Sequence, residues 1–280
     1  MEKSQIETLS GGLSSMISIF LLHPIDLVRI TQISTQQNLV PTFKSIWDMK
    51  RRSKGCNVLN FYRAFPISAF SYTGTYMIFF PINSFLKEQN PANIQNEYLK
   101  YVFASIPPSL LSMTICNPLW TTKAVQIASN QNETMNLTSS VKHIYNKSGK
   151  MGFYKGLSLG YLNNLNGIIS FSTYDILKSI IRDYKHLPDT SGLGFYDLLF
   201  CSLASKTIAT TVCFPILATR IRQQVNQETL VAALRKTLHS PHSKFWNGLL
   251  FSLALQLPKN SLMMLIYEYS KKALSLNKEN

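Results

Sequence analysis

Residues 23–29 read His-Pro-Ile-Asp-Leu-Val-Arg, and two later stretches of the chain share their pattern. Residues 117–123 read Asn-Pro-Leu-Trp-Thr-Thr-Lys, and residues 214–220 read Phe-Pro-Ile-Leu-Ala-Thr-Arg. Each stretch has a proline followed five residues later by a cation, and each ends an apolar run of helix length. The prolines lie 94 and 97 residues apart. A motif that recurs at a long and nearly constant interval indicates a chain built from similar repeats.

The length and composition fit three repeats in a membrane. We expect the 280 residues to divide into repeats at 1–93, 94–190 and 191–280. Charged residues make up 15% of the chain, below the roughly 25% that is usual in soluble domains. The mean hydropathy of +0.02 is too low for helices that face lipid on all sides. It fits membrane spans that show one face to lipid and another to water.

The net charge of +14 favours anionic partners. The basic residues form no single dense patch, so we expect no nucleic acid, which leaves membrane lipid and a phosphorylated solute as partners. Four cysteines show no disulfide framework and no CxxC pair. His239 and His242 are three residues apart but have no acid or cysteine nearby, so we expect no metal and no cofactor.

Six stretches are long enough to span a bilayer, at about 20 residues each. Pro24, Pro118 and Pro215 lie inside the first, third and fifth stretches and are expected to kink them. Polar residues at helical spacing within the spans point to a bundle interior or to water. The sequence therefore predicts an all-α membrane protein. The expected spans are residues 8–33, 64–87, 100–126, 157–181, 196–222 and 246–272.

A polar connector follows each odd span and ends in an aromatic tetrapeptide. The copies are Phe-Tyr-Arg-Ala at 61–64, Phe-Tyr-Lys-Gly at 153–156 and Phe-Trp-Asn-Gly at 245–248. Short helices are expected within the connectors, at residues 42–49 and 137–146.

Together these motifs resemble the mitochondrial carrier family across nearly the whole chain. The proline motifs resemble that family's Pro-x-[Asp/Glu]-x-x-[Lys/Arg] signature, and residues 174–178 and 267–271 resemble its aromatic-acid-x-x-cation signature. The resemblance implies six tilted helices around a pseudo-threefold axis, in three tandem repeats with short matrix helices. It also implies a monomeric, multi-pass carrier of the inner mitochondrial membrane that works by alternating access between two gates and is not an enzyme.

The second motif position reads Asp26, Trp120 and Leu217 in the three copies. This order is similar to that of the flavin adenine dinucleotide and folate carriers, as is the Leu-Ala-Ser-Lys segment at 203–206. We therefore expect flavin adenine dinucleotide or a related flavin or folate as substrate. A pyrimidine nucleotide or NAD carrier, which also has tryptophan in the second motif, is the alternative, as is a peroxisomal nucleotide carrier.

In the family, the acid of one odd helix pairs with the cation of the next. The resemblance then pairs Asp26 with Lys123, leaves Trp120 under Arg220 as a cation–π contact, and sets Leu217 against an unpaired Arg29. The alternative is that these six residues only hold kinked helices together. For the gate on the cytoplasmic side, the resemblance implies four residues: Asp175, Lys178, Glu268 and Lys271.

On that side Lys178 is expected to pair with Glu268. In span two, the aromatic-acid-x-x-cation signature is aligned on residues 80–84. This alignment puts Pro81 at the position of the acid and Ser84 at the position of the cation. Because both charges are missing, this gate is expected to be weak.

Substrate contacts are expected from cations and polar groups within the spans. Lys206 lies 14 residues before Arg220, nearly four helical turns, so both cations are expected to point in a similar direction. Lys259 and Gln256 share a helix face. A dinucleotide needs such cations for its pyrophosphate. Its rings are expected to stack on or hydrogen-bond with Tyr161, Asn163 or Asn166.

Two other classes compete with a carrier of nucleotides. One is a family member kept as a membrane interaction protein without transport, which the lost charges of span two allow. The other is an enzyme, but the sequence contains no Gly-rich phosphate loop, no ligand cluster and no nucleophile–base set.

Overall fold

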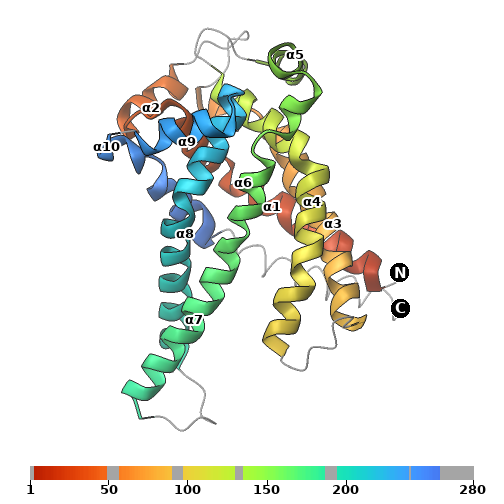
Figure 1. The fold of residues 1–280 in the computed structure, drawn as a ribbon, viewed down its shortest axis with the longest axis vertical. Helices are drawn as coiled ribbons and strands as arrows, with labels where there is room; N and C mark the ends of the chain where they lie inside the picture. The colour runs from red at the N-terminus through yellow and green to blue at the C-terminus, as the bar shows by residue number, and fades with distance from the viewer. Residues whose placement is uncertain are drawn as a thin grey trace.

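The computed structural model describes residues 3–48, 57–89, 97–129, 135–186, 194–239 and 241–258, and these residues form helices and connecting turns (Figure 1). The long helices are α1 (Lys3–Thr35), α3 (Phe65–Gln89), α4 (Glu97–Ala128), α7 (Leu165–Tyr184) and α8 (Phe195–Asn226). The shorter helices are α2 (Leu39–Trp47), α5 (Leu137–Ser148), α6 (Leu157–Asn163), α9 (Leu230–Leu238) and α10 (His242–Phe245), with 3-10 turns at Asn57–Tyr62 and Lys150–Tyr154. A further apolar helix covers Leu249–Pro258.

The expected spans agree with the long helices at four places and differ at one. α1, α3, α4 and α8 cover the first, second, third and fifth spans, and the motif prolines lie inside continuous helices. The fourth span is not one helix, because Asn164 separates α6 from α7. Most of the sixth expected span lies outside the described residues. The connector helices begin or end within a few residues of the predicted bounds, at α2 and α5.

Two helical stretches, Ser15–Thr35 and Tyr196–Asn226, are apolar enough as well as long enough to cross a membrane. The other long helices carry more polar residues and prolines along their length. On α1 the burial pattern is the reverse of a soluble helix, since Ser15 and Ser18 are buried while Phe20 and Leu21 are each 53% exposed. Such an exposed apolar face is consistent with contact to lipid.

The last residue of each aromatic tetrapeptide adopts a positive φ. Ala64, Gly156 and Gly248 all have a positive φ, of 61°, 78° and 95°. They lie 92 residues apart, a more regular interval than that of the prolines. Glycine adopts this conformation freely, whereas a residue with a Cβ is strained there. The first repeat therefore carries a strained turn that the other two avoid.

A second contact within each repeat ties the residue before the motif proline to the same tetrapeptide. His23 Nε2 is 2.8 Å from the carbonyl of Arg63, and Asn117 Nδ2 donates to the carbonyl of Phe153 at 2.8 Å. In the third repeat Phe214 stacks on Trp246 instead, with ring centroids 5.8 Å apart. Each odd helix is thus fixed to the end of its own connector at the level of the proline.

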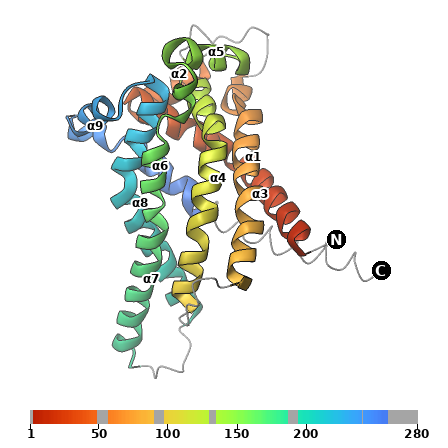
Figure 2. The same ribbon diagram turned by 45° about the vertical axis from the view of Figure 1, so that its right-hand side comes forward.

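The odd helices α1, α4 and α8 meet through their C-terminal halves. Gln224 of α8 donates to Thr121 of α4 at 3.3 Å, and Arg222 Nε of α8 donates to the carbonyl of Ile33 in α1 at 3.1 Å. The short helices α2, α5 and α9 lie at this end in both views (Figures 1 and 2). At the opposite end, the lower part of α7 stands apart from α4 in Figure 1.

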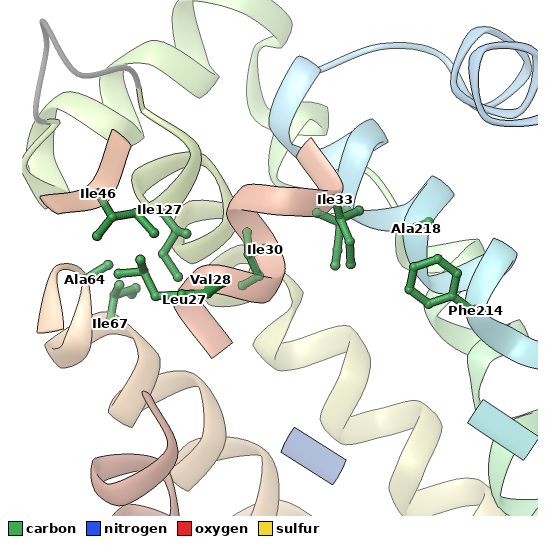
Figure 3. Close-up of a cluster of buried hydrophobic side chains, with 11 residues drawn as sticks. Leu27, Val28, Ile30, Ile33, Ile46, Ala64, Ile67, Ile127, Phe214 and Ala218 are labelled. Atoms are coloured by element: carbon green, nitrogen blue, oxygen red, sulfur yellow. The ribbon is translucent and has the colours of Figure 1, made fainter. Parts of the chain in front are cut away.

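The apolar core lies around the C-terminal half of α1 (Figure 3). Leu27 of α1 lies close to Ile67 of α3 and Ile127 of α4, and Ile33 faces Phe214 of α8. One short buried segment of α1 therefore contacts α3, α4 and α8, and this segment begins within the first motif, at Leu27.

Candidate functional site

Asp26 is completely buried where α1 meets α4. Its carboxylate forms ion pairs with two cations, the ammonium of Lys123 on α4 and, at 2.5 Å, the guanidinium of Arg29 one turn further along α1. The Tyr72 hydroxyl of α3 donates to the same carboxylate at 3.4 Å. The predicted Asp26–Lys123 pair is therefore present. The expectation of an unpaired Arg29 beside Leu217 is corrected, because Arg29 shares the acid of its own helix.

Two aromatic rings surround the Lys123 ammonium. Its Nζ lies 4.4 Å from the centroid of the Tyr72 ring and 4.9 Å from that of Trp120. The two rings meet edge to face at 4.6 Å, and Trp120 Nε1 donates to Thr75 Oγ1 at 3.2 Å. Among the described cation–ring contacts, Trp120 thus holds Lys123 and not the predicted Arg220. Lys123 lies three residues after Trp120 on the same helix, and side chains at this spacing are neighbours on the helix surface.

Arg220 on α8 lies in a different environment, between α4 and α6. Its Nη2 lies 3.1 Å from the sulfur of Met113, a weak acceptor. Its Nε is buried without a hydrogen-bond partner. A Cβ added to Gly160 of α6 would lie 3.2 Å from its Cζ, so the guanidinium packs directly on the backbone of that helix. The side chain is buried, and no carboxylate among the described residues pairs with it.

The three motif cations and one motif acid leave this junction with excess positive charge. Arg29, Lys123 and Arg220 are all buried, and Asp26 is their one acidic partner among the described residues. Charges inside a membrane protein are costly unless they are paired, and they usually mark a functional site. The junction is therefore suited to an anion that reaches it from outside the protein.

At the motif position, the contact between the third and first repeats is apolar. Leu217, at the position of the motif acid, packs against the core cluster that contains Ile33, Phe214 and Ala218. Figure 3 shows the last three facing one another across α1 and α8. No ion pair links these two helices within the described residues.

The third residue of each aromatic tetrapeptide links its repeat to the next one. Arg63 donates to carbonyls at the end of α4, Lys155 to the carbonyl of Gln227 after α8, and Asn247 at 3.1 Å to the carbonyl of Gln36 after α1. The C-terminal end of a helix carries partial negative charge and attracts such donors. Burial lowers the pKa of Arg63 to about 10, and it also lowers the pKa of Lys155.

These links were not predicted from the sequence, where the position looked variable. The sequence does carry a sign of these links, because all three copies of this position are hydrogen-bond donors and two of them are cations.

The polar residues expected to contact substrate fall into two groups. In the first, Lys206 Nζ donates to Asn166 Oδ1 at 2.8 Å, which joins α8 to α7. Thr210 Oγ1, one turn along α8, donates to Gln256 Oε1 at 3.3 Å. Lys206, Asn166 and Gln256 are thus brought near one another, while Lys259 lies outside the described residues.

In the second group, the hydroxyls of Tyr161 and Thr114 are 2.6 Å apart, which joins α6 to α4. Asn163 is half-buried near the end of α6. Lys206 and Arg220 were expected to point in a similar direction, and both do approach the fourth span. They meet different parts of it, because Lys206 contacts α7 and Arg220 packs on α6.

The expected cytoplasmic gate is only partly within the described residues. Asp175 is exposed and Lys178 is half-buried, and neither forms an ion pair with a described residue. Glu268 and Lys271 lie outside the described residues, so the pairing of Lys178 with Glu268 stays a prediction.

The left-handed residues give a different register for span two. Lys87 follows Ala64 at the same interval as Lys271 follows Gly248. Lys178, however, follows Gly156 by 22 residues and not 23, so span four does not support the same register. The alignment of the signature on residues 80–84 therefore stays a prediction.

Comparison with known families shows what kind of protein carries this junction. The family model described as mitochondrial carrier protein matches residues 95–185 and 191–278, more than half of the chain. The chain belongs to the mitochondrial carrier family. The repeats of this family imply a six-span, multi-pass carrier of the inner mitochondrial membrane, and its members are transporters and not enzymes.

Three relatives of this carrier show its range of similarity. Solute carrier family 25 member 33 of Mus musculus is 25% identical over 205 residues, which cover 69% of this chain and 64% of the relative. Mitochondrial substrate carrier family protein W of Dictyostelium discoideum is 24% identical, with 98% of this chain and 88% of the relative covered.

Mitochondrial nicotinamide adenine dinucleotide transporter 1 of Saccharomyces cerevisiae is 23% identical, with 98% and 78% covered. The chain spans less than two thirds of the length of the first relative and most of the length of the other two.

Proposed function

We propose that this chain transports a nucleotide or dinucleotide anion across the inner mitochondrial membrane by alternating access. Six spans would surround a pseudo-threefold axis, with repeats at residues 1–93, 94–190 and 191–280. The motif residues at the junction of α1, α4 and α8 would form the matrix-side gate. Asp175, Lys178, Glu268 and Lys271 would contribute to the gate on the other side.

The observation that carries this proposal is the excess of buried positive charge at the junction. Three motif cations face one carboxylate, and Arg220 has a thioether where a counter-ion would be expected. A neutral or cationic solute gains nothing from this arrangement. A phosphate group gains charge-assisted hydrogen bonds, which are about twice as strong as neutral ones.

The relatives favour a different substrate from the flavin expected first. Trp120 in the second motif fits flavin, pyrimidine nucleotide and NAD carriers alike, so that residue does not separate them. One of the relatives that aligns with nearly the whole chain is named as a nicotinamide adenine dinucleotide transporter, and none of the three reported above is named for a flavin or folate. We therefore place NAD or a pyrimidine nucleotide ahead of flavin adenine dinucleotide.

Uptake into proteoliposomes tests the proposal. The purified chain is reconstituted, and labelled NAD and uridine triphosphate are offered with unlabelled competitors. The competitors are flavin adenine dinucleotide, folate, ATP and malate. We expect a nucleotide or NAD to be taken up and to compete best. Uptake that malate or folate inhibits while every nucleotide fails to do so would show that the substrate class is wrong.

Two variants connect uptake to the candidate contacts. Lys206→Ala removes the cation that contacts Asn166, and we expect it to weaken uptake mainly through apparent affinity. Lys142→Ala removes a cation of the same charge from the exposed surface of α5 and is the matched control. Equal loss in both variants would mean that general charge, and not this site, controls uptake.

The competing class is a family member that no longer transports. If it were correct, no solute of the panel would accumulate in vesicles although the protein inserts and folds.

A further inference from the structure

We infer that Arg220, together with the hydroxyls of Thr114 and Tyr161, forms a phosphate subsite between α4, α6 and α8. This inference rests on the proposed function and names the part of the substrate that the site would hold. The subsite lies in the contact between the second and third repeats, where Arg220 meets Met113 of α4 and Gly160 of α6.

The buried side chain of Arg220 supplies the positive charge of the subsite. It is 8% exposed, its Nε has no hydrogen-bond partner, and its described acceptor is the Met113 sulfur at 3.1 Å. Leaving a buried charge without a counter-charge is strongly destabilising. Since no described carboxylate reaches Arg220, a bound anion is the counter-charge that this position lacks.

Two hydroxyls join the same pair of helices, α4 and α6, that Arg220 contacts. Thr114 directly follows Met113 on α4, and Tyr161 directly follows Gly160 on α6. Both Met113 and Gly160 contact the guanidinium, and the two hydroxyls are 2.6 Å apart. Thr114 Oγ1 donates to the carbonyl of Leu110 at 2.7 Å, so Tyr161 is the donor between the two hydroxyls. The Tyr161 proton can turn from Thr114 towards a phosphate oxygen, because a hydroxyl proton is free to rotate.

The shape of the Arg220 guanidinium fits a phosphate group. A guanidinium is planar and presents several N–H donors in a fixed fork, which matches the oxygens of a phosphate. Gly160 has no side chain, so the guanidinium can lie flat on the backbone of α6; a Cβ there would come within 3.2 Å of both Cζ and the Met113 sulfur. Met113 is flexible and polarisable, so it can move aside when an anion enters.

The contrast with Arg29 explains why this cation and not another is assigned. Arg29 and Lys123 are held by Asp26, and a substrate phosphate would have to compete with that carboxylate. Arg220 has no such competitor among the described residues. In the pairing that the family resemblance implies, the acid facing Arg220 would stand in the second motif, where this chain has Trp120. A substrate anion would supply the negative charge that this acid no longer provides.

A gain-of-acid variant tests the subsite. Met113→Glu places a carboxyl carbon where the sulfur now lies, so the protein supplies its own counter-ion to Arg220. Met113→Gln has the same shape without the charge and is the matched control. Binding is measured as the ligand-induced rise in melting temperature of the detergent-purified chain, with NAD, uridine triphosphate, inorganic pyrophosphate and the phosphate-free nucleoside uridine.

We expect Met113→Glu to weaken the apparent affinity for NAD and uridine triphosphate by about tenfold or more, as for loss of a hydrogen bond to a charged group. Met113→Gln should stay within about threefold of the wild type. Uridine should be weak in all three proteins, because it has no phosphate. Arg220→Gln, measured in parallel, should weaken nucleotide binding to a similar extent as Met113→Glu.

Two results overturn different parts of the argument. If the wild type binds and transports nucleotides while Met113→Glu and Arg220→Gln bind them equally well, the subsite is wrong and the carrier function stands. If the wild type shows no response to any phosphate-bearing ligand and no nucleotide uptake, the proposed function fails first. Should Met113→Glu unfold, its melting temperature without ligand will fall below that of Met113→Gln, which would contradict a missing counter-ion at Arg220.

Discussion

The contact between α1 and α4 and the contact between α8 and α1 use the same motif position with opposite chemistry. In the first, the carboxylate of Asp26 reaches across to Lys123 and also holds Arg29. In the second, Leu217 packs into an apolar cluster with Ile33. One chain thus joins neighbouring repeats once by buried charge and once by hydrophobic burial.

The difference bears on how the matrix-side gate opens. Separating α1 from α4 breaks a buried ion pair, but water that enters can hydrate both charges. Separating α8 from α1 breaks the hydrogen bond from Arg222 to the Ile33 carbonyl and also exposes the apolar side chains around Leu217. Exposing apolar side chains to water makes this contact less favourable to open. We therefore expect the charged contact to open and close more readily and the apolar contact to hold the third repeat against the first.

The largest expected effect comes from removing the acid that joins the charged contact. Asp26→Asn leaves Arg29, Lys123 and Arg220 buried together without a carboxylate among the described residues. Removing one partner of a buried ion pair costs about 3–5 kcal/mol. We expect a large fall in the melting temperature of the purified protein and loss of uptake.

The matched change in the apolar contact is Leu217→Ala. Leu217 is only partly buried, so we expect a cost of about 2 kcal/mol, at the low end for such a truncation. If Leu217→Ala destabilised the protein as much as Asp26→Asn, the distinction between the two contacts would lose its energetic basis.

Exchanging the charges of Asp26 and Lys123 tests how much Arg29 contributes to the charged contact. Asp26→Lys with Lys123→Asp restores an opposite-charge pair between α1 and α4. It also places a lysine one turn from Arg29, which now contacts the carboxylate at 2.5 Å. We therefore expect little rescue of uptake by the double exchange and more when Arg29→Gln is added. Full rescue by the double exchange alone would show that the Arg29 contact does not contribute.

The second prediction concerns the left-handed glycines that follow the tetrapeptides. A Cβ added at Gly248 would lie 2.6 Å from Ile33 Cγ1, inside the contact with α1, where φ is also +95°. We expect Gly248→Ala to cost about 3 kcal/mol, the sum of backbone strain and overpacking. Gly149→Ala is the control, because its φ is +61° but nothing lies within 4 Å of the added atom.

Gly149→Ala should therefore show a backbone cost alone, about 1–3 kcal/mol, because its ψ of −158° lies in a region that essentially only glycine adopts. Thermal unfolding in detergent measures both variants. Equal melting temperatures would mean that the approach of Gly248 to Ile33 is looser than the structure shows.

The third prediction concerns the aromatic side of the charged contact. Trp120→Leu removes the ring 4.9 Å from the Lys123 ammonium and the hydrogen bond to Thr75. A cation–π contact contributes about 0.5–2 kcal/mol and a hydrogen bond about 1 kcal/mol, so we expect a loss of about 2 kcal/mol. Trp120→Phe keeps a ring and should lose about half as much. If the two variants unfold at the same temperature, the ring under Lys123 makes no net contribution.

The sequence predicts the long helices from apolar runs and repeated spacing, and the resemblance to the carrier family implies the Asp26–Lys123 pair, which the structure contains. It misses the Arg29–Asp26 pair although the signal was available, since residues three apart on a helix are neighbours. It assigns Arg220 to Trp120 because motif pairing ignores side-chain direction, and in the structure Lys123 reaches that ring first.

Other features depend on geometry that no single motif shows. The division of span four is a single turn residue, Asn164, whose φ and ψ stay in the right-handed helical region, and the hydrophobic pattern does not show it. The links from Arg63, Lys155 and Asn247 join residues more than 60 positions apart in the chain. Their common role becomes visible only when the carbonyls they reach are placed at the ends of the odd helices.

The smallest expected effect comes from the link that closes the ring of repeats. Arg63 and Lys155 bring charge to the ends of α4 and α8, whereas Asn247 brings a neutral amide to the end of α1. A cation near a helix C-terminus contributes about 0.3–1 kcal/mol. Asn247→Arg should therefore raise the melting temperature by about 1–3 °C, given the shift expected for a chain of this size.

Arg63→Asn, the reciprocal change, should lower the melting temperature and by more, because the buried guanidinium reaches two carbonyls, those of Ile127 and Ser129. The pair of measurements compares a charged link with a neutral one at equivalent positions of two repeats. If Asn247→Arg lowers stability while Arg63→Asn leaves it unchanged, the links are set by shape and not by charge. In that case the neutral residue at the third link would be a requirement of the close contact between Gly248 and Ile33.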